Sequence, residues 1–333
     1  MKTLLYNKEI KEIPMLIGKT IIITGTTSGI GFITVKTLLD KGARILLLNR
    51  KSVRSKNSFK YFLSYFPKAD LHNIECDLQN FQSVNQAIEQ ITYICKEGID
   101  VLCNNAGVMA LKDLATIDGF DVQMQVNHLS HFLLTRRLMP LIELAAKNKG
   151  ESRVINHSSI ARFGCEKLDP IYLEKRGGEL GGNQNGRWIR YSQTKLANAV
   201  FTACLYERMK NKNINVKSLV AHSGLVKTEI QNTTSKDGAK GLWLSDQMLK
   251  NGQSLEDGAL SIIKCISDRS VEAGKFYGPG EGKLAFKGSV KVFDLESATD
   301  LVTVAKISTV WPAKLAPKSN SNVLPVGEPD KVN

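Results

Sequence analysis

Short apolar runs rich in β-branched residues alternate along the chain with segments whose apolar residues recur at helical spacing. The runs predict strands and the segments between them predict helices. We place strands near residues 20–24, 43–49, 70–76, 99–103, 152–156, 214–220 and 274–278, and helices near 29–41, 80–97, 117–148, 191–211 and 254–268. This alternation predicts an α/β fold, a doubly wound parallel sheet with helices on both faces.

One glycine-rich segment interrupts the alternation. Residues 160–190 read as a long loop, and long ordered loops in compact domains often cover binding sites. Elsewhere no linker separates the elements, so we expect one domain over residues 18–280. Residues 1–17 form an N-terminal extension in this interpretation, and residues 281–333 form a C-terminal extension that is disordered from about residue 312.

The composition is that of an ordinary folded protein, with 333 residues, 42% hydrophobic and 23% charged. Lys and Arg exceed Asp and Glu by 45 − 32 = 13, which favours anionic partners or reflects a solvated basic surface. No finger spacing, basic zipper or long basic run indicates nucleic-acid binding. The six cysteines lack any Cys-x-x-Cys pair, so we expect buried thiols and no metal site.

Localisation follows from two further absences in the sequence. The N-terminal stretch is broken by charges and does not resemble a signal peptide, and no apolar run is long enough to span a bilayer. We expect a cytoplasmic protein, and peripheral contact with an anionic membrane surface stays open as an alternative.

The stretch TGTTSGIG, residues 24–31, joins the first predicted strand to the first long helix. Gly25, Gly29 and Gly31 permit a tight turn and a close approach of the backbone to a ligand. The amino end of the following helix would attract an anion such as a pyrophosphate. The alternative is a tight turn that binds nothing.

The ends of the next strands extend this prediction. The second strand ends in Asn49, Arg50 and Lys51, where an NAD-binding fold usually carries an acidic residue for the ribose hydroxyl, so NADP(H) is favoured over NAD(H). The alternative is a solvated strand end. Asp77 after the third strand suits the adenine amino group or the cap of the next helix, and residues 104–107, NNAG, follow the fourth strand where ligands bind in open α/β sheets.

A second group of residues suits proton transfer. Tyr191 and Lys195 are four residues apart on a predicted helix and share a face, and a neighbouring ammonium lowers a phenol pKa. Tyr191 can then act as general acid or base between a carbonyl and an alcohol. Ser158 or Ser159, after the fifth strand, can bond a carbonyl oxygen or simply cap the next segment. Asn127 lies mid-helix, where an amide either organises water or backbone near the site or is an ordinary buried residue.

Together these motifs resemble those of the short-chain dehydrogenase/reductase family, and they occur in family order over residues 18–280. The resemblance implies a single-domain Rossmann fold with seven parallel strands. It implies that Tyr191 is the proton donor, that Lys195 binds the nicotinamide ribose and lowers the Tyr191 pKa, that Ser159 orients the substrate oxygen, and that Asn127 holds a water in a proton relay. The cofactor contacts it implies are Gly25, Ser28, Gly29, Ile30, Gly31, Arg50, Asp77, Leu78, Asn105, Ala106, Gly107, Tyr191, Lys195, Val226 and Thr228.

Within the family the sequence is most similar to the retinol dehydrogenase and WW-domain oxidoreductase group, whose members mostly prefer NADP(H). Two positions depart from the family pattern: Ser223 stands where a proline usually precedes Gly224, and His157 replaces an aliphatic residue before the serine pair. Family members are often homo-oligomers, but nothing in this sequence fixes the oligomeric state, so a homo-oligomer stays open here.

We therefore expect an NADP(H)-dependent oxidoreductase that interconverts a carbonyl and an alcohol on a small apolar substrate such as a retinoid, a steroid or a fatty aldehyde. The alternative from another functional class is a non-catalytic NADP(H)-sensing protein on the same fold.

Overall fold

The computed structural model describes residues 3–241, 249–280 and 286–295. Its centre is an eight-stranded sheet with the order β3-β2-β1-β4-β5-β6-β7-β8. The first seven strands are parallel, and the last pairs antiparallel with β7. The strands are β1 (Thr20–Thr24), β2 (Arg44–Asn49), β3 (Leu71–Glu75), β4 (Val101–Asn104), β5 (Ser152–His157), β6 (Val216–Ala221), β7 (Lys275–Pro279) and β8 (Val290–Asp294).

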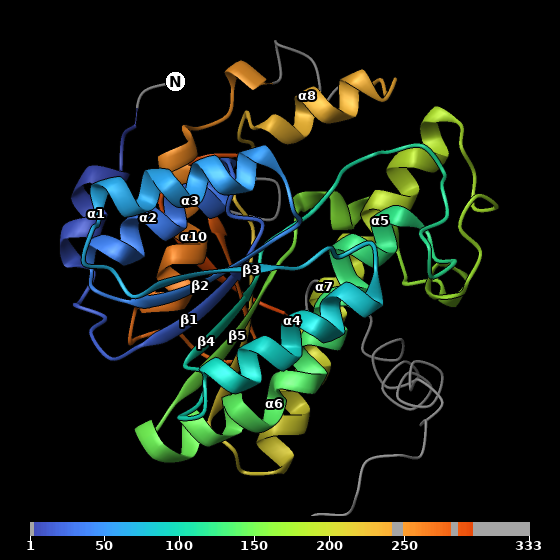
Figure 1. Ribbon diagram of the computed structural model, residues 1–333. Coiled ribbons are helices and arrows are strands. Elements are labelled where there is room, and N and C mark those ends of the chain that lie inside the picture. Colours follow the sequence, from blue (N-terminus) through green and yellow to red (C-terminus); the bar gives the residue numbers. More distant parts are fainter. Residues whose placement is uncertain (1–2, 242–248, 281–285, 296–333) are drawn as a thin grey trace, which may run out of the picture.

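Helices cover both faces of the sheet, as the sequence predicts. In Figure 1, α1, α2, α3 and α10 lie on one side, and α4, α6 and α7 lie on the other. The α-helices are α1 (Tyr6–Glu12), α2 (Gly29–Asp40), α3 (Val53–Tyr65), α4 (Phe81–Ile94), α5 (Val122–Met124), α6 (Ser130–Lys149), α7 (Gln184–Asn211), α8 (Glu229–Lys236) and α10 (Leu255–Ser267). A π-helical turn, Gln125–Leu129, joins α5 to α6, and 3₁₀ turns span Ile160–Gly164 and Pro170–Leu173.

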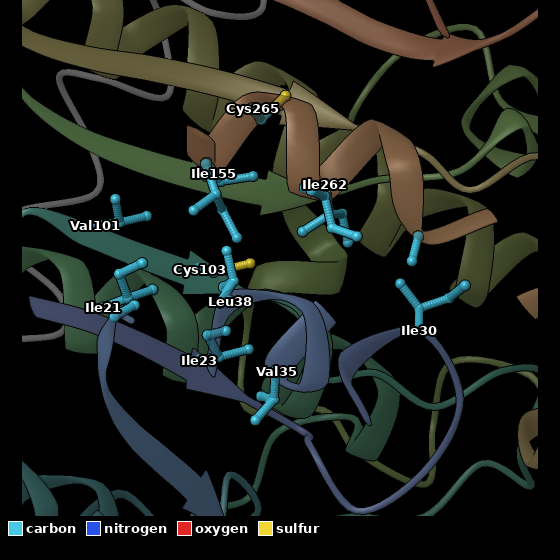
Figure 2. Close-up of a cluster of buried hydrophobic side chains, with 14 of the residues drawn as sticks. Ile21, Ile23, Ile30, Val35, Leu38, Val101, Cys103, Ile155, Ile262 and Cys265 are labelled. Atoms are coloured by element: carbon cyan, nitrogen blue, oxygen red, sulfur yellow. The ribbon is translucent and has the colours of Figure 1, made fainter. Parts of the chain in front are cut away.

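The two layers follow from the alternation of side chains along each strand. In β1, Ile21 and Ile23 face α2 and α10, whereas Ile22 faces the layer of α4 and α6. Adjacent Val154 and Ile155 of β5 divide in the same way. Because both faces are buried, these strands are apolar at consecutive positions. Figure 2 shows the first layer, where side chains of β1, β4 and β5 meet those of α2 and α10.

The class of fold is confirmed, and so is the parallel order of the seven predicted strands. The eighth strand was not expected. It comes from residues 290–294, within the predicted C-terminal extension, and its register pairs Phe293 with Phe276. The disorder predicted from about residue 312 lies outside the described residues.

The predicted loop at residues 160–190 is only partly a loop, because α7 begins at Gln184. Asn183 caps the helix by accepting a hydrogen bond from the Gly186 N–H at 2.7 Å. This capping bond outweighs the helix-weakening effect of Gly186, which led the sequence prediction to start the helix at residue 191.

The amino edge of the sheet is held by a buried carboxylate. Asp100, which precedes β4, accepts hydrogen bonds from Lys19 Nζ at 3.0 Å, Lys149 Nζ at 2.7 Å and the Thr20 N–H at 2.9 Å. These bonds fasten the start of β1 and the end of α6 to β4. They lie at the opposite end of the strands from the cleft described next.

Within residues 3–241, 249–280 and 286–295, no helix combines the length and the apolar content needed to cross a bilayer. All six cysteines are free thiols, and four of them are buried.

Candidate active site

A cleft with a cavity volume of about 350 Å³ lies at the carboxyl ends of the strands. Of the seventeen residues predicted to be catalytic or to bind the cofactor, sixteen line it, and Asn127 is the exception. They are Gly25, Ser28, Gly29, Ile30, Gly31, Arg50, Asp77, Leu78, Asn105, Ala106, Gly107, Ser159, Tyr191, Lys195, Val226 and Thr228. The fold thus brings together residues that lie up to about two hundred positions apart in the chain.

The glycine turn is shaped partly by its own packing. Gly25 has φ +71°, and a Cβ at this position would lie 2.8 Å from Cα of Ala106. A Cβ at Gly31 would overlap the Gly25 carbonyl oxygen. Gly29 differs, because it has φ +62° but its Cβ would meet only Thr228, at 3.7 Å. Gly25 and Gly31 are therefore required by the close packing of the turn, and Gly29 by its left-handed backbone.

This turn fits the pyrophosphate of a dinucleotide. Ser28 is the N-cap residue of α2, yet its side chain makes no capping hydrogen bond. The first N–H groups of a helix carry a partial positive charge and lack partners within the helix. Both Ser28 and these groups border the cavity, so they can bind an anionic oxygen.

Two amide side chains hold the turn in place. Asn49 accepts a hydrogen bond from the Thr26 N–H at 2.9 Å and donates to Thr26 Oγ1 at 2.8 Å. Asn105 donates to the carbonyls of Thr24 and Gly25, at 2.8 and 3.1 Å. The ends of β1, β2 and β4 are thereby linked directly beneath the turn.

The far end of the cleft is lined by two arginines. Arg50 follows β2, and Arg54 lies in the first turn of α3. The sequence prediction missed Arg54 because it missed α3, although Ser52 is a typical N-cap residue and accepts a hydrogen bond from the Ser55 N–H at 3.0 Å. Two cations near the end of β2 suit a phosphate group.

Asp77 lies on the same side of the cleft. It accepts a hydrogen bond from the Gln79 N–H, whereas the N-cap of α4 is Asn80. The alternative role as the helix cap is therefore filled by another residue, and the Asp77 carboxylate borders the cavity.

At the opposite end of the cleft, Tyr191 and Lys195 of α7 lie next to Ser159. Tyr191 and Lys195 are 7% and 5% exposed, and Lys195 Nζ lies 5.7 Å from the centre of the tyrosine ring. The Ser159 side chain hydrogen-bonds that of Tyr191, and it also accepts a hydrogen bond from the Ala161 N–H. Ser158 instead donates to the carbonyl of Lys195 at 2.7 Å. Of the two serines, Ser159 is the one bonded to the tyrosine.

The effect of Lys195 on the Tyr191 pKa stays a prediction, because burial dominates the pKa of both groups. Burial raises the pKa of Tyr191 to about 12, and the hydrogen bond with Ser159 opposes this shift only in part. Burial also lowers the pKa of Lys195 to about 8. Desolvation is the largest influence on the Tyr191 pKa, so the phenol keeps its proton at neutral pH.

Asn127 organises backbone instead of lining the cavity. Its side chain accepts from the Val108 N–H at 2.7 Å and donates to the Val108 carbonyl and to Thr194 Oγ1. Its own carbonyl accepts from His131 and Asn198. Both amide protons and the carbonyl oxygen of Asn127 are thus used in hydrogen bonds within the protein. The structure therefore supports the role in organising backbone, and the Asn127 side chain has no donor left for the water of a proton relay. The π-helical turn at residues 125–129 gives the residue this position.

An apolar wall beside Tyr191 escaped the sequence analysis because no motif marks it. Met109, Ala161, Trp188 and Ile230 contact one another around Tyr191. The Trp188 ring meets the tyrosine edge-on with 6.3 Å between centroids, and its Nε1 donates to the Lys240 carbonyl at 2.7 Å. The wall is therefore built from four different segments of the chain.

Buried Arg190 anchors the segments behind this wall. It is fully buried, pairs with Asp121 at 2.6 Å and donates to the carbonyls of Leu111 and Gly181. Because Arg190 directly precedes Tyr191 in α7, it ties the tyrosine's helix to both neighbouring loops.

A doubly wound sheet, a glycine turn before α2 and a Ser, Tyr and Lys set at the carboxyl edge define the class of Rossmann-type oxidoreductases. The comparisons agree with this class. Residues 19–172 match the family model described as short chain dehydrogenase. A short-chain dehydrogenase/reductase of Armillaria gallica is 34% identical over 230 residues, which cover 67% of this chain and 70% of the relative. The chain belongs to the short-chain dehydrogenase/reductase family.

Other relatives place the chain more finely. Human retinol dehydrogenase 13 is 32% identical over 223 residues, covering 67% of this chain and 63% of the relative, so the resemblance to that group is confirmed. The chain spans 63–65% of the length of several curated relatives. The solved structure of L-sorbose reductase from Gluconobacter frateurii, complexed with NADPH and L-sorbose, matches with a TM-score of 0.60 and 22% identity over 82% of this chain and 99% of that one, which establishes the fold.

Proposed function

We propose that the protein is an NADP(H)-dependent oxidoreductase that interconverts a carbonyl and an alcohol on a small apolar molecule. The observation that carries the proposal is that one cleft joins the glycine turn, two arginines and the Ser159, Tyr191 and Lys195 set. When bound, the cofactor supplies or accepts the hydride. The chain's own residues bind it, orient the substrate and move the proton.

Tyr191 is the proposed proton donor in the reducing direction. Its raised pKa keeps the hydroxyl protonated at neutral pH, and its bond with Ser159 fixes the hydroxyl at the cavity wall. Ser159 would then donate to the same substrate oxygen, on which negative charge grows during reduction. Lys195 would hold a ribose hydroxyl from its position beside Tyr191. In the oxidising direction Tyr191 would have to lose its proton before it could accept one from the substrate alcohol.

The proposed cofactor preference rests on Arg50 and Arg54. A guanidinium binds a phosphate through charge-assisted hydrogen bonds, and NADP(H) differs from NAD(H) by one such group. The glycine turn would hold the pyrophosphate, and Asp77 would face the adenine. Backbone atoms near Val226 and Thr228 would complete the nicotinamide side.

The proposed substrate class rests on the wall of Met109, Ala161, Trp188 and Ile230. Apolar side chains that line a pocket favour ligands with apolar surface through burial of that surface. Retinoids, steroids and fatty aldehydes share this property together with a single carbonyl or hydroxyl group.

The test is a turnover assay with Tyr191→Phe. We expect wild-type protein to oxidise NADPH with apolar aldehydes or ketones, retinal included, and the variant to lose about 10²- to 10⁴-fold in kcat, because phenylalanine cannot donate the proton. NADPH binding, followed by its fluorescence, should be unchanged. Tyr65→Phe is the matched control, since Tyr65 is exposed and lies outside the cleft. Equal turnover by wild type and Tyr191→Phe would refute the proton-donor role.

A further inference from the structure

His157 is an unusual residue in a central position. It ends β5, directly before the two serines. It borders the cleft, and its carbonyl accepts hydrogen bonds from Lys195 Nζ at 3.1 Å and from Asn198 Nδ2 at 3.0 Å. The side chain therefore lies beside the ammonium group of the catalytic set.

The hydrogen bonds of Asn105 determine the tautomer of His157. The Asn105 amide nitrogen donates to the carbonyls of Thr24 and Gly25, so the amide oxygen faces the imidazole. That oxygen lies 3.1 Å from His157 Nδ1 and can only accept. His157 Nδ1 must therefore carry a proton and donate it.

The charge of His157 follows from its surroundings. Burial and the nearby Lys195 ammonium lower the pKa of His157 to about 3, so the ring is neutral at neutral pH. A neutral imidazole protonated at Nδ1 has an unprotonated Nε2, which is a hydrogen-bond acceptor.

Nε2 is the free end of this ring. Nε2 has no hydrogen-bond partner in the described part of the chain. It is nevertheless not a sealed, unsatisfied atom, because solvent can reach it. Since His157 borders the cleft, Nε2 opens onto it. The structure thus presents a fixed acceptor at the floor of the cleft, between Asn105 and Lys195, where an aliphatic side chain would present none.

We propose that His157 is a positioning residue whose Nε2 accepts a hydrogen bond from an N–H or O–H group of the nicotinamide riboside half of the bound dinucleotide. This inference rests on the proposed function. The nicotinamide riboside half of the dinucleotide is assigned to His157 by its position in the cleft. Arg50, Arg54 and Asp77 line the proposed adenosine end, whereas His157 lies at the end that holds Tyr191 and Lys195.

Two ligands separate the halves of the cofactor in the test. Binding of NADP⁺ and of adenosine 2′,5′-bisphosphate, which lacks the nicotinamide riboside, is measured by calorimetry for wild type, His157→Leu and His157→Gln. We expect His157→Leu to raise the Kd for NADP⁺ about tenfold and to leave the Kd for the bisphosphate unchanged, because one hydrogen bond to the riboside is lost. His157→Gln keeps an acceptor and should recover part of the affinity. His72→Leu, at an exposed histidine of β3, is the matched control.

The donor is identified with the 3-acetylpyridine analogue of NADP⁺, which carries a methyl group in place of the carboxamide nitrogen. If the carboxamide is the donor, His157→Leu weakens the binding of NADP⁺ but not the binding of the analogue. If a ribose hydroxyl is the donor, His157→Leu weakens the binding of both compounds equally. Either result supports the proposal.

Three results would overturn the inference. An unchanged Kd for NADP⁺ in His157→Leu would show that Nε2 binds nothing on the cofactor, while the proposed function would stand. An equal loss for NADP⁺ and the bisphosphate in both variants would show a general structural role. Failure of the wild type to bind NADP⁺ at all would reject the proposed function and this inference together.

Discussion

Arg54 illustrates how a single exposed side chain can set the preference between two cofactors. It borders the cleft from the first turn of α3, two residues beyond the N-cap Ser52. Neighbouring Lys51 does not border the cleft. The two cations therefore offer a matched comparison.

We expect Arg54→Ser to raise the Kd for NADPH by about tenfold and to change the Kd for NADH little, because a charge-assisted hydrogen bond is lost only with the phosphorylated cofactor. Fluorescence titration of both cofactors measures the effect. Lys51→Ser should leave both constants unchanged. A similar loss for both cofactors in Arg54→Ser would place the guanidinium on a shared part of the cofactor instead.

The ion pair of Arg190 and Asp121 is a different kind of residue-scale feature, since both side chains are almost completely removed from solvent. Asp121 also accepts a hydrogen bond from the Met124 N–H at 2.9 Å. Removing the carboxylate leaves the guanidinium buried and without its counter-charge.

Asp121→Ala should therefore lower the free energy of unfolding by about 3–5 kcal/mol. Equilibrium urea unfolding measures this change. Glu179→Ala breaks the exposed pair with Arg176 and should cost less than about 1 kcal/mol. Equal losses in the two variants would mean that the buried pair contributes no more than a surface pair.

At the scale of elements, the sequence was most informative where residues are buried on both sides. Consecutive apolar residues identified β1, β2 and β5, and the strand ends then located Gly25, Asn105 and Ser159 in one cleft, because parallel strands end at a common edge.

The elements that escaped prediction lack such a pattern. Helix α3 buries only Ser55, Ser58 and Phe62, so most of its length reads as polar surface. Strand β8 is largely exposed and contains two charged residues within VKVFD. Residues whose importance depends on a missed element, such as Arg54, could not be predicted. The acceptor at His157 depends on a tautomer set by Asn105, and only the three-dimensional structure shows that bond.

Helix α1 is attached to the domain mainly through one carboxylate. Asp257 of α10 accepts hydrogen bonds from the N–H groups of Leu4, Leu5 and Tyr6, at 2.8, 3.0 and 2.9 Å. No α1 residue is fully buried, although Tyr6 packs against the core and its hydroxyl hydrogen-bonds Thr37 of α2.

Asp257→Ala should release α1 from α10. We expect the amide protons of residues 4–12 to exchange with solvent at least about tenfold faster, because the capping bonds are worth roughly 1 kcal/mol or more together. Hydrogen exchange followed by mass spectrometry measures this change, with Glu12→Ala as the control. Unchanged protection of this segment would mean that other contacts hold the helix.

At the scale of the whole molecule, buried histidines make stability depend on pH. Burial lowers the pKa of His128 to about 4 and that of His131 and His222 to about 3. In the unfolded chain these groups titrate near pH 6.5, so as the pH falls below about 6.5 the unfolded state takes up protons first. The stabilisation is complete above that pH and is lost progressively toward the folded-state pKa values.

We therefore expect the urea concentration at the unfolding midpoint to decrease as the pH is lowered from about 7 to about 5. Each buried histidine should lower the free energy of unfolding by up to about 1.4 kcal/mol per pH unit. In His128→Gln the slope should be smaller than in the wild type. An identical slope in the two proteins would mean that His128 does not drive the effect.

The two edges of the sheet carry different kinds of residue. At the amino edge, Asp100 ties together Lys19, Thr20 and Lys149, far from the cleft. At the carboxyl edge, the wall beside Tyr191 consists of side chains from four separate segments. In evolutionary terms, this separation makes the molecule modular: substitutions at positions such as Met109, Trp188 or Ile230 would alter the proposed substrate wall and leave the bonds of Asp100 at the opposite edge in place.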